Sequence, residues 1–366
     1  MATSKRKIDI FFLLMVSILT IGGFVIFLSA SLGLIAKGGD TFQAIAMKQG
    51  ISLLIGIVLF FVISRIKYTF WRKTAFFTLI AAFAINLALY IPGLSIHHGG
   101  ATRWIDLGFI SFQPSEFLKI AFIIYMAAWI HFAKDKIRTF KFGVLPFIIL
   151  MAILSSLLFL QNDTDTLVII LFTGITMLFI AGMKIKHIII SVLLLLLTLG
   201  VFIFFKPHAQ TRIMTYFNNG SDSQTSGYQI NQSLIAIGSG QWSGRGFGQS
   251  IQKFSYLPQP TDDSIFAVTA EEFGFIGSSL LIIFYLLLAS SLFRIANRAE
   301  DHFAGMMAVG IGILVVSESF LNIAAMMGLI PLSGLPLLFV SHGGTALIIV
   351  LASAGIVANI SRYGKR

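Results

Sequence analysis

The chain has 366 residues, of which 57% are hydrophobic and only 11% are charged. A soluble domain of this size needs more charge to cover its surface, so the composition excludes that class and indicates a polytopic membrane protein. There is no cysteine, which excludes disulfides, thiolate nucleophiles and cysteine-bound metals. Orientation signals and anionic lipid headgroups account for the net charge of +11, so we expect no nucleic acid partner.

Apolar runs of about 17–25 residues, the length that crosses a bilayer, recur along the chain. They predict an all-α fold with ten transmembrane helices in a single domain covering residues 1–366. In chain order, the expected spans are residues 10–32, 49–65, 74–92, 115–133, 142–160, 165–183, 187–205, 265–293, 304–329 and 340–361.

Lysine and arginine are distributed unevenly over the connecting segments. With the N-terminus placed in the cytoplasm, 18 of the 26 lie on the inner side, 7 lie on the outer side, and Lys119 falls within a span. This bias predicts that both termini are cytoplasmic. Two long polar segments, residues 93–114 and 206–264, then face outward, the second of them between the seventh and eighth spans. Within the first, the apolar residues of 99–113 suit a segment lying in the membrane interface.

Asp263 lies at the end of the second outer segment, immediately before the eighth span. An Asp at this place is typical of a helix N-cap, where it stabilises the first turn. The alternative is a general base at the outer membrane surface, where partial burial would raise its pKa toward neutrality. The residues alone leave both interpretations open.

Several other acids lie inside or next to expected spans. Glu271 and Glu272 fall within the eighth span, and Glu318 lies near the middle of the ninth. Acids in apolar helices are costly, so each either holds a neighbouring cation or has a functional role. Asp163 and Asp165 lie in a short outer turn, where capping of the sixth span explains at least one of them.

Four cations near the outer face are candidates for binding a phosphate. Lys119 lies about one turn below the surface, and Glu116 three residues before it can pair with it, so a structural role is equally open. Arg103 belongs to the first outer segment. Arg245 and Lys253 belong to the second, in a glycine-rich stretch that lacks the ending of a nucleotide-binding loop.

Four blocks of the sequence form a specific pattern. They are Gly100-Ala101-Thr102-Arg103-Trp104-Ile105 with Gln113-Pro114-Ser115-Glu116 and Lys119; Tyr228-Gln229 with residues 232–240; Gly244, Gly246, Gly248, Ser250, Gln252-Lys253, Tyr256-Leu257-Pro258, Asp263, Ile265-Phe266-Ala267, Glu271-Glu272 and Gly274; and Pro331-Leu332-Ser333-Gly334-Leu335-Pro336 with Ser341 and Gly343-Gly344. These blocks resemble the SEDS family (shape, elongation, division and sporulation) of polytopic peptidoglycan glycosyltransferases. The stretch 250–258 is more similar to the division members, of the FtsW type, than to the elongation members, of the RodA type. With the order of spans, the resemblance covers essentially the whole chain.

The chain departs from the family pattern at a few positions. The family's catalytic Asp matches Asp263, and Asp262 replaces a usual Thr. His342 stands where Tyr is usual, and Glu318 stands near a usual Gln. Asp163 is kept, although the Pro and Gly around it are lost.

The resemblance implies that the chain polymerises lipid II at the outer face of the bacterial cytoplasmic membrane, at the division septum, by an inverting mechanism. Asp263 would be the general base, and a divalent cation (Mg²⁺ or Mn²⁺) is a candidate cofactor at the pyrophosphate. A class B penicillin-binding protein, other membrane proteins of the division complex and membrane lipids are the implied partners. The residues expected to bind substrate are Arg103, Glu116, Lys119, Asp163, Arg245, Lys253, Glu271, Glu272 and Ser341.

Three alternatives remain open from the sequence. A lipid II flippase or transporter would use the intramembrane Lys119, Glu272 and Glu318 as a polar pathway. A polymerase of the RodA type would act in elongation. A non-catalytic scaffold of the division complex would tolerate the loss of Asp263.

Overall fold

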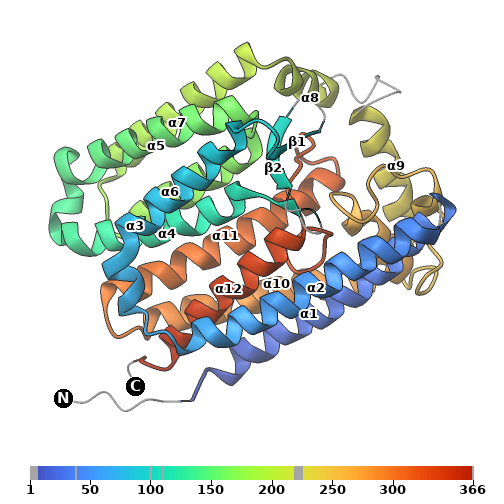
Figure 1. Ribbon diagram of the computed structural model, residues 1–366, viewed down its shortest axis with the longest axis horizontal. Coiled ribbons are helices and arrows are strands. Elements are labelled where there is room, and N and C mark those ends of the chain that lie inside the picture. Colours follow the sequence, from blue (N-terminus) through green and yellow to red (C-terminus); the bar gives the residue numbers. More distant parts are fainter. Residues whose placement is uncertain are drawn as a thin grey trace.

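The computed structural model describes residues 7–37, 39–98, 101–106, 108, 111–217 and 226–364. In this part, the chain forms a bundle of long helices with a small sheet at one end (Figure 1). The helices are α1 (Ile10–Ser31), α2 (Gly39–Arg65), α3 (Thr69–Leu87), α4 (Pro114–Ala133), α5 (Leu145–Gln161), α6 (Thr164–Ile180), α7 (Ile185–Phe205), α8 (Pro207–Phe217), α9 (Ser226–Ser239), α10 (Ile265–Asn297), α11 (His302–Met326) and α12 (Gly344–Ser361).

Nine helical stretches within the described ranges are long and apolar enough to cross a bilayer. This confirms the helical membrane-protein class that the composition predicts. The remaining apolar run forms α6, which is shorter, with 17 residues. The count of ten crossings therefore stays a prediction, and α8 and α9 are additional helices within the second outer segment.

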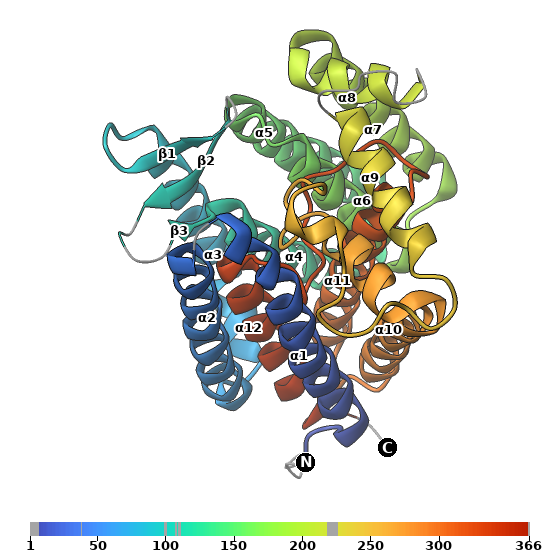
Figure 2. The same cartoon turned by 90° about the vertical axis from the view of Figure 1, so that its right-hand side faces the viewer.

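The two ends of the bundle differ in character. The start of α1 and the end of α12 lie together, where the Asp9 backbone N–H donates to the Ser361 hydroxyl at 3.1 Å. The sheet, α8 and α9 gather at the opposite end (Figures 1 and 2). Since the lysine and arginine bias predicts that the termini are cytoplasmic, this opposite end is the expected outer face.

Helices in the centre of the bundle are buried on nearly all sides. In α11 and α12, 72% of the membrane-length window is buried, whereas in α7 only 11% is buried. A helix that is apolar all round suits a buried position, and the exposed apolar surface of α7 suits contact with lipid. The centre is therefore built from α4, α11 and α12, with α10 packed along α11.

Three short antiparallel strands, β1 (Ser95–His98), β2 (Ala101–Asp106) and β3 (Ser111–Phe112), form the first outer segment in the order β1-β2-β3. Ile105 is paired with Ser95 on one side and with Phe112 on the other. The sequence predicts an interfacial segment over 99–113 and an all-α chain. The three strands are a local addition to a chain that is otherwise helical, as predicted, and their pairing satisfies the backbone here. The interfacial location of 99–113 stays a prediction. Residues 99, 100, 107, 109 and 110 lie outside the described part.

Helix α10 is broken at Gly274, whose φ of 65° is non-helical. A break leaves backbone groups without intrahelical partners. The glycine-rich stretch supplies them, because Arg245 N–H donates to Glu271 O at 3.0 Å and Phe275 N–H donates to Gln241 O at 2.8 Å. Residues 241–253 of this stretch therefore cross over the break in α10, and they are called the strap below.

Candidate active site at the outer end of the bundle

Asp263 lies in a segment, residues 261–263, that is held by the C-terminal third of the chain. Its three successive backbone carbonyls each accept one hydrogen bond, and the donors come from α11 and from the connection between α11 and α12. The position of Asp263 is therefore fixed through its backbone, which leaves the carboxylate for other contacts. The bonds run from His342 N–H to Thr261 O (2.8 Å), from the Ser341 hydroxyl to Asp262 O (2.8 Å) and from Asn322 Nδ2 to Asp263 O (2.9 Å).

Helix capping is not the role of Asp263. The N-cap position of α10 is occupied by Ser264, and its side chain makes no capping hydrogen bond. The Ser264 hydroxyl instead donates to Pro258 O at 2.9 Å and accepts from Gln229 Nε2 at 3.0 Å. These contacts tie the start of α10 to the outer segment and favour the second interpretation of Asp263, that of a functional acid.

Gly334 marks the point where three side chains from distant parts of the chain converge. A Cβ added to it would lie 3.3 Å from Asp165 Oδ2, 3.6 Å from Arg212 Nη2 and 3.9 Å from Asp263 Oδ2. The Gly334 N–H also donates to Asp165 Oδ2 at 3.1 Å. The start of α6, helix α8 and the segment before α10 therefore meet at one site.

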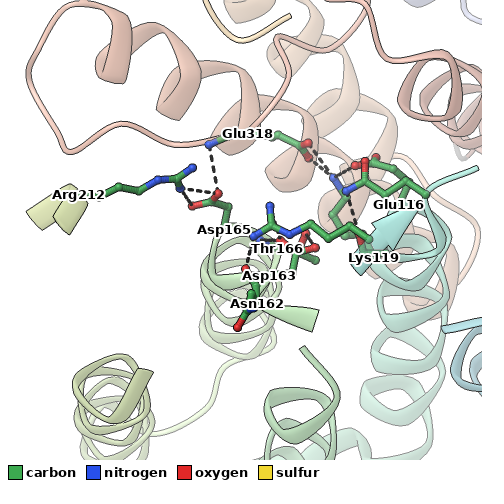
Figure 3. Close-up of polar contacts among 12 residues, drawn as sticks. Glu116, Lys119, Asn162, Asp163, Asp165, Thr166, Arg212 and Glu318 are labelled. Atoms are coloured by element: carbon green, nitrogen blue, oxygen red, sulfur yellow. Dashed lines mark hydrogen bonds and ion pairs between the residues drawn. The ribbon is translucent and has the colours of Figure 1, made fainter. Parts of the chain in front are cut away.

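Arg212 and Asp165 form an ion pair at this site (Figure 3). Arg212 Nη1 lies 3.0 Å and 3.3 Å from the two carboxylate oxygens of Asp165. The Arg212 side chain keeps 23% of its surface exposed, so part of the guanidinium is open to a ligand. The sequence marks Arg212 only as one of several outer cations and Asp165 as a capping candidate, because the contact joins residues 47 positions apart.

Arg103 of β2 is anchored at the turn between α5 and α6. Its Nη1 lies 3.8 Å from Asp163 Oδ1, and its Nη2 donates to Asn162 O. Asp163 is buried and caps α6, accepting from the Thr166 N–H at 3.3 Å and from the Thr166 hydroxyl at 2.9 Å (Figure 3). Asp163 thus positions Arg103 and the start of α6, and its expected contact with substrate stays a prediction that this geometry does not favour.

Ser341 also has a positioning role in these contacts. It is buried, donates to Asp262 O and accepts from Leu337 N–H, both at 2.8 Å. A hydroxyl that is used in both directions has little capacity left for a ligand. Its expected contact with substrate therefore finds no support in this geometry.

The surroundings of Asp263 alter its acidity. Its side chain is half-buried, and burial raises the pKa of the carboxyl to about 8. The carboxylates of Asp262 and Asp165 add to the rise, whereas the cations of Arg212 and Arg103 oppose it. A carboxyl with a pKa near neutrality is suited to accept a proton from a hydroxyl group.

Lys119 of α4 is enclosed by two acids. Its Nζ lies 2.9 Å from Glu116 Oε1 and 2.7 Å and 2.8 Å from the two carboxylate oxygens of Glu318 (Figure 3). All three side chains are buried. The expected i, i+3 pair therefore exists, and Glu318 has the partner that the sequence could not identify. Because its three ammonium hydrogens already have acceptors, Lys119 has no donor left for a phosphate.

A second buried cluster holds the strap to α10. Lys253 Nζ lies 2.6 Å from Glu272 Oε1, and Arg245 Nε lies 3.3 Å from Glu271 Oε1. Glu271 also accepts from the Ser250 hydroxyl at 2.5 Å. Glu271 lies six residues into α10, about 9 Å along its axis. Lys253 and both acids are thus used in structural pairs, and their expected substrate contacts are not favoured. Arg245 keeps 39% of its side chain exposed.

The described side chains do not provide a ready ligand set for a divalent cation. No group of three or more His, Asp or Glu residues with suitable spacing occurs among the positions that the structure describes. Asp165 is already committed to Arg212 and to the Gly334 N–H. Because Mg²⁺ is commonly held by one or two carboxylates together with substrate phosphates, the Mg²⁺ or Mn²⁺ expected from the resemblance stays a prediction.

The fold and the site together define a class: a polytopic helical membrane protein in which aspartate and arginine side chains converge at the expected outer end of the bundle. The chain belongs to the family described as Cell cycle protein, the FtsW/RodA/SpoVE family, which matches residues 9–366. The family membership that the sequence blocks indicate is thereby confirmed.

Curated relatives agree with this membership, and solved structures share the fold. The chain is 36% identical to a protein of Geobacter sp. (strain M18) named Probable peptidoglycan glycosyltransferase FtsW, over 96% of each chain. It is 34% identical to Stage V sporulation protein E of Bacillus subtilis (strain 168) over 100% of each chain. The fold is shared with a chain from a structure described as "Structural coordination of polymerization and crosslinking by a peptidoglycan synthase complex", at a TM-score of 0.80 and 23% identity, covering 97% of this chain and 98% of that one. It is shared as well with the rod shape determining protein RodA of Thermus thermophilus, at a TM-score of 0.70 and 22% identity over 97% of each chain.

Proposed function

We propose that this chain is a peptidoglycan glycosyltransferase that polymerises lipid II at the outer face of the cytoplasmic membrane, with Asp263 as general base. The observation that carries the proposal is the convergence of Asp263 with the Arg212–Asp165 pair at Gly334. An acid of raised pKa beside partly exposed cations suits a reaction that removes a proton and releases a pyrophosphate. The names of the relatives give the class of reaction.

In the proposed step, the 4-hydroxyl oxygen of an acceptor GlcNAc attacks the anomeric carbon of a lipid-linked MurNAc. The hydroxyl proton passes to the Asp263 carboxylate as the new carbon–oxygen bond forms. The bond from the anomeric carbon to the pyrophosphate breaks, and its electron pair leaves with undecaprenyl pyrophosphate. An α-linked donor thus gives a β-1,4 product by one displacement, with no covalent intermediate.

Two arginines are best placed for the leaving group: Arg103, which the sequence also predicts for this role, and Arg212, which it does not. Arg212 and Arg103 keep 23% and 18% of their side chains exposed, and both act on Asp263 electrostatically. Lys119 and Lys253 are buried in ion pairs. We therefore assign the stabilisation of the developing pyrophosphate charge to Arg212 and Arg103, since guanidinium groups bind phosphate oxygens in pairs.

Lipid II flipping is less well supported than polymerisation. A polar pathway would have to use Lys119, Glu272 and Glu318, and each of these is buried and engaged in an ion pair. Breaking a buried pair to let a headgroup pass would leave uncompensated charges, at a cost of about 3–5 kcal/mol each time. The function in division, the septal location and a class B penicillin-binding protein as partner remain parts of the proposal, supported by the FtsW relatives and by the subject of the related complex.

The decisive experiment is a gel assay of purified protein with lipid II, with and without a class B penicillin-binding protein. We expect wild-type protein to form glycan strands and Asp263→Asn to form none while it remains folded. Strands made by Asp263→Asn at the wild-type rate would refute the assignment of the base. Transfer of labelled lipid II across liposomes that depends on Glu318 and not on Asp263 would favour the flippase.

A further inference from the structure

Next to Asp263, the side chains of Asp262 and His342 contact each other at the expected outer face. His342 Nδ1 lies 3.1 Å from Asp262 Oδ1, and 29% of the His342 side chain and 38% of the Asp262 side chain are exposed. The imidazole also stacks on Phe27 of α1, with ring centroids 5.8 Å apart. The ring is thus held against the carboxylate while both groups remain accessible to protons from water.

The pair is joined to Asp263 by contacts that do not depend on its charge. The His342 N–H donates to Thr261 O, and the neighbouring Ser341 hydroxyl donates to Asp262 O. These bonds fix the spacing between the connection after α11 and the segment that carries Asp263. Substituting the side chain of His342 or Asp262 therefore changes the electrostatic environment of Asp263 while these two hydrogen bonds to the backbone carbonyls remain.

We propose that His342 is a positioning residue which, by pairing with Asp262, sets the pH range over which Asp263 works as the base. This inference rests on the proposed function and deepens it. The negative charge of Asp262 opposes ionisation of Asp263, because two neighbouring carboxylates repel each other. A hydrogen on His342 Nδ1 donates to the Asp262 carboxylate and so weakens the repulsion that this carboxylate exerts on Asp263.

The other charged groups that act on Asp263 are less able to vary with pH. Arg212 from α8 and Arg103 from β2 favour its ionisation, and Asp165 from α6 opposes it. Arginine stays protonated in proteins, and Asp165 is held ionised by its bond to Arg212. The contact between Asp262 and His342 is therefore the part of this environment that a substitution can change without breaking the Arg212–Asp165 pair.

The test is the pH dependence of polymerisation from pH 6 to 10, measured on full-length protein in liposomes with lipid II. The variants are Asp262→Asn, which removes the charge, and His342→Phe, which keeps a ring against Phe27. The double variant and His342→Gln, which keeps a donor without a titrating group, complete the set. Thermal unfolding of each variant identifies any that fail to fold.

We expect Asp262→Asn to move the rising limb of the profile to lower pH by about 0.5–1 unit, the size of one charge acting over a few ångströms of partly hydrated protein. His342→Phe should move it to higher pH, and His342→Gln should move it less. In the Asp262→Asn background, His342→Phe should have no further effect on the midpoint. An unmoved midpoint in Asp262→Asn, or an equal shift by His342→Phe in both backgrounds, overturns the proposal.

A second readout separates this proposal from the proposed function. Infrared difference spectra over the same pH range, with Asp263→Asn as the reference, report the ionisation of the Asp263 carboxyl without any turnover. If no variant polymerises lipid II but the infrared midpoint shifts as expected, the proposed function fails and the electrostatic link holds. If wild-type protein polymerises and neither midpoint shifts in the variants, the link fails and the function holds.

Discussion

Lys119 on α4 donates to both carboxylate oxygens of Glu318 on α11, at 2.7 Å and 2.8 Å. This contact joins two central helices of the bundle through residues 199 positions apart. Because Glu116 is the second acceptor of the same ammonium group, three charged side chains share one buried place. The arrangement indicates a structural role for Lys119 in the bundle and leaves the outer arginines as the candidate cations for substrate.

Lys119→Met should therefore destabilise the protein strongly. The substitution leaves Glu116 and Glu318 buried with no cation, and breaking a buried pair from one side costs about 3–5 kcal/mol. Glu318→Gln should be much milder, since the amide still accepts from Lys119 and Glu116 remains to balance the charge. Thermal unfolding in detergent measures both. A Lys119→Met protein of normal stability with weakened lipid II binding would restore the phosphate-binding interpretation.

Polymerisation by the wild-type protein should increase with pH between about 7 and 9. The base must be ionised, and burial raises the pKa of Asp263 to about 8, so the rate is half-maximal near that pH. The measurement is the initial rate of strand formation at saturating lipid II. A profile that is flat from pH 6 to 9 would show that Asp263 does not act as the base.

The same pKa rise has a consequence for stability. The folded state holds the Asp263 proton more tightly than the unfolded chain does, where the ordinary value is 3.8. The proton on Asp263 therefore stabilises the folded state fully below about pH 4, and this contribution to the free energy of unfolding is lost as the pH rises through 8. Wild-type protein should lose thermal stability relative to Asp263→Asn between pH 6 and pH 9. Parallel melting temperatures across this range would contradict the raised pKa.

The sequence predicts the membrane class, the family and Asp263 because these depend on composition and on local motifs. Apolar runs report helices that cross a bilayer, whatever their neighbours are. The motif at Ile265-Phe266-Ala267 fixes the register of Asp263 without knowledge of the fold. The small sheet escapes prediction, since strands of six residues or fewer give a weak periodic signal.

The partners of the charged residues could not be predicted, because they are set by tertiary contacts. Arg212 meets Asp165, and Lys119 meets Glu318, across separations that no local pattern reports. The resemblance groups Lys253 and Glu272 with the substrate, but the fold joins them to each other across the strap. Sequence motifs thus predict candidate residues, whereas the contact that each residue makes is defined only by the fold.

Arg212→Gln should slow polymerisation by about 100-fold, the usual cost of losing one donor to a developing negative charge. Arg245→Gln is the matched control, because Arg245 is an exposed outer arginine paired with Glu271 in the second cluster. We expect it to keep most of its activity. Steady-state kinetics with lipid II distinguish loss of turnover from loss of binding.

Loss of the Arg212 cation also leaves Asp165 unpaired, and this effect needs its own control. The double variant Arg212→Gln/Asp165→Asn removes both charges of the pair. If the double variant regains the wild-type rate, Arg212 serves only to neutralise Asp165. Equal losses in Arg212→Gln and Arg245→Gln would instead favour the broader set of cations predicted from the sequence.

Gly334→Ala should lower activity more than stability. The added Cβ would enter the space among Asp165, Arg212 and Asp263, 3.3 Å from the first carboxylate and 3.9 Å from the last. All three side chains are partly exposed, so they can shift to relieve the contact at little cost in unfolding free energy, about 1 kcal/mol or less. A shift of this kind displaces the proposed base and its neighbouring cation, and small displacements of catalytic groups are costly to turnover.

Gly22→Ala in α1 is the control, because nothing lies within 4 Å of its Cβ. We expect Gly22→Ala to leave the rate unchanged, whereas Gly334→Ala lowers it several-fold and Gly334→Leu abolishes it at normal expression and melting temperature. Full activity in Gly334→Leu would mean that the reaction does not take place at this convergence of side chains.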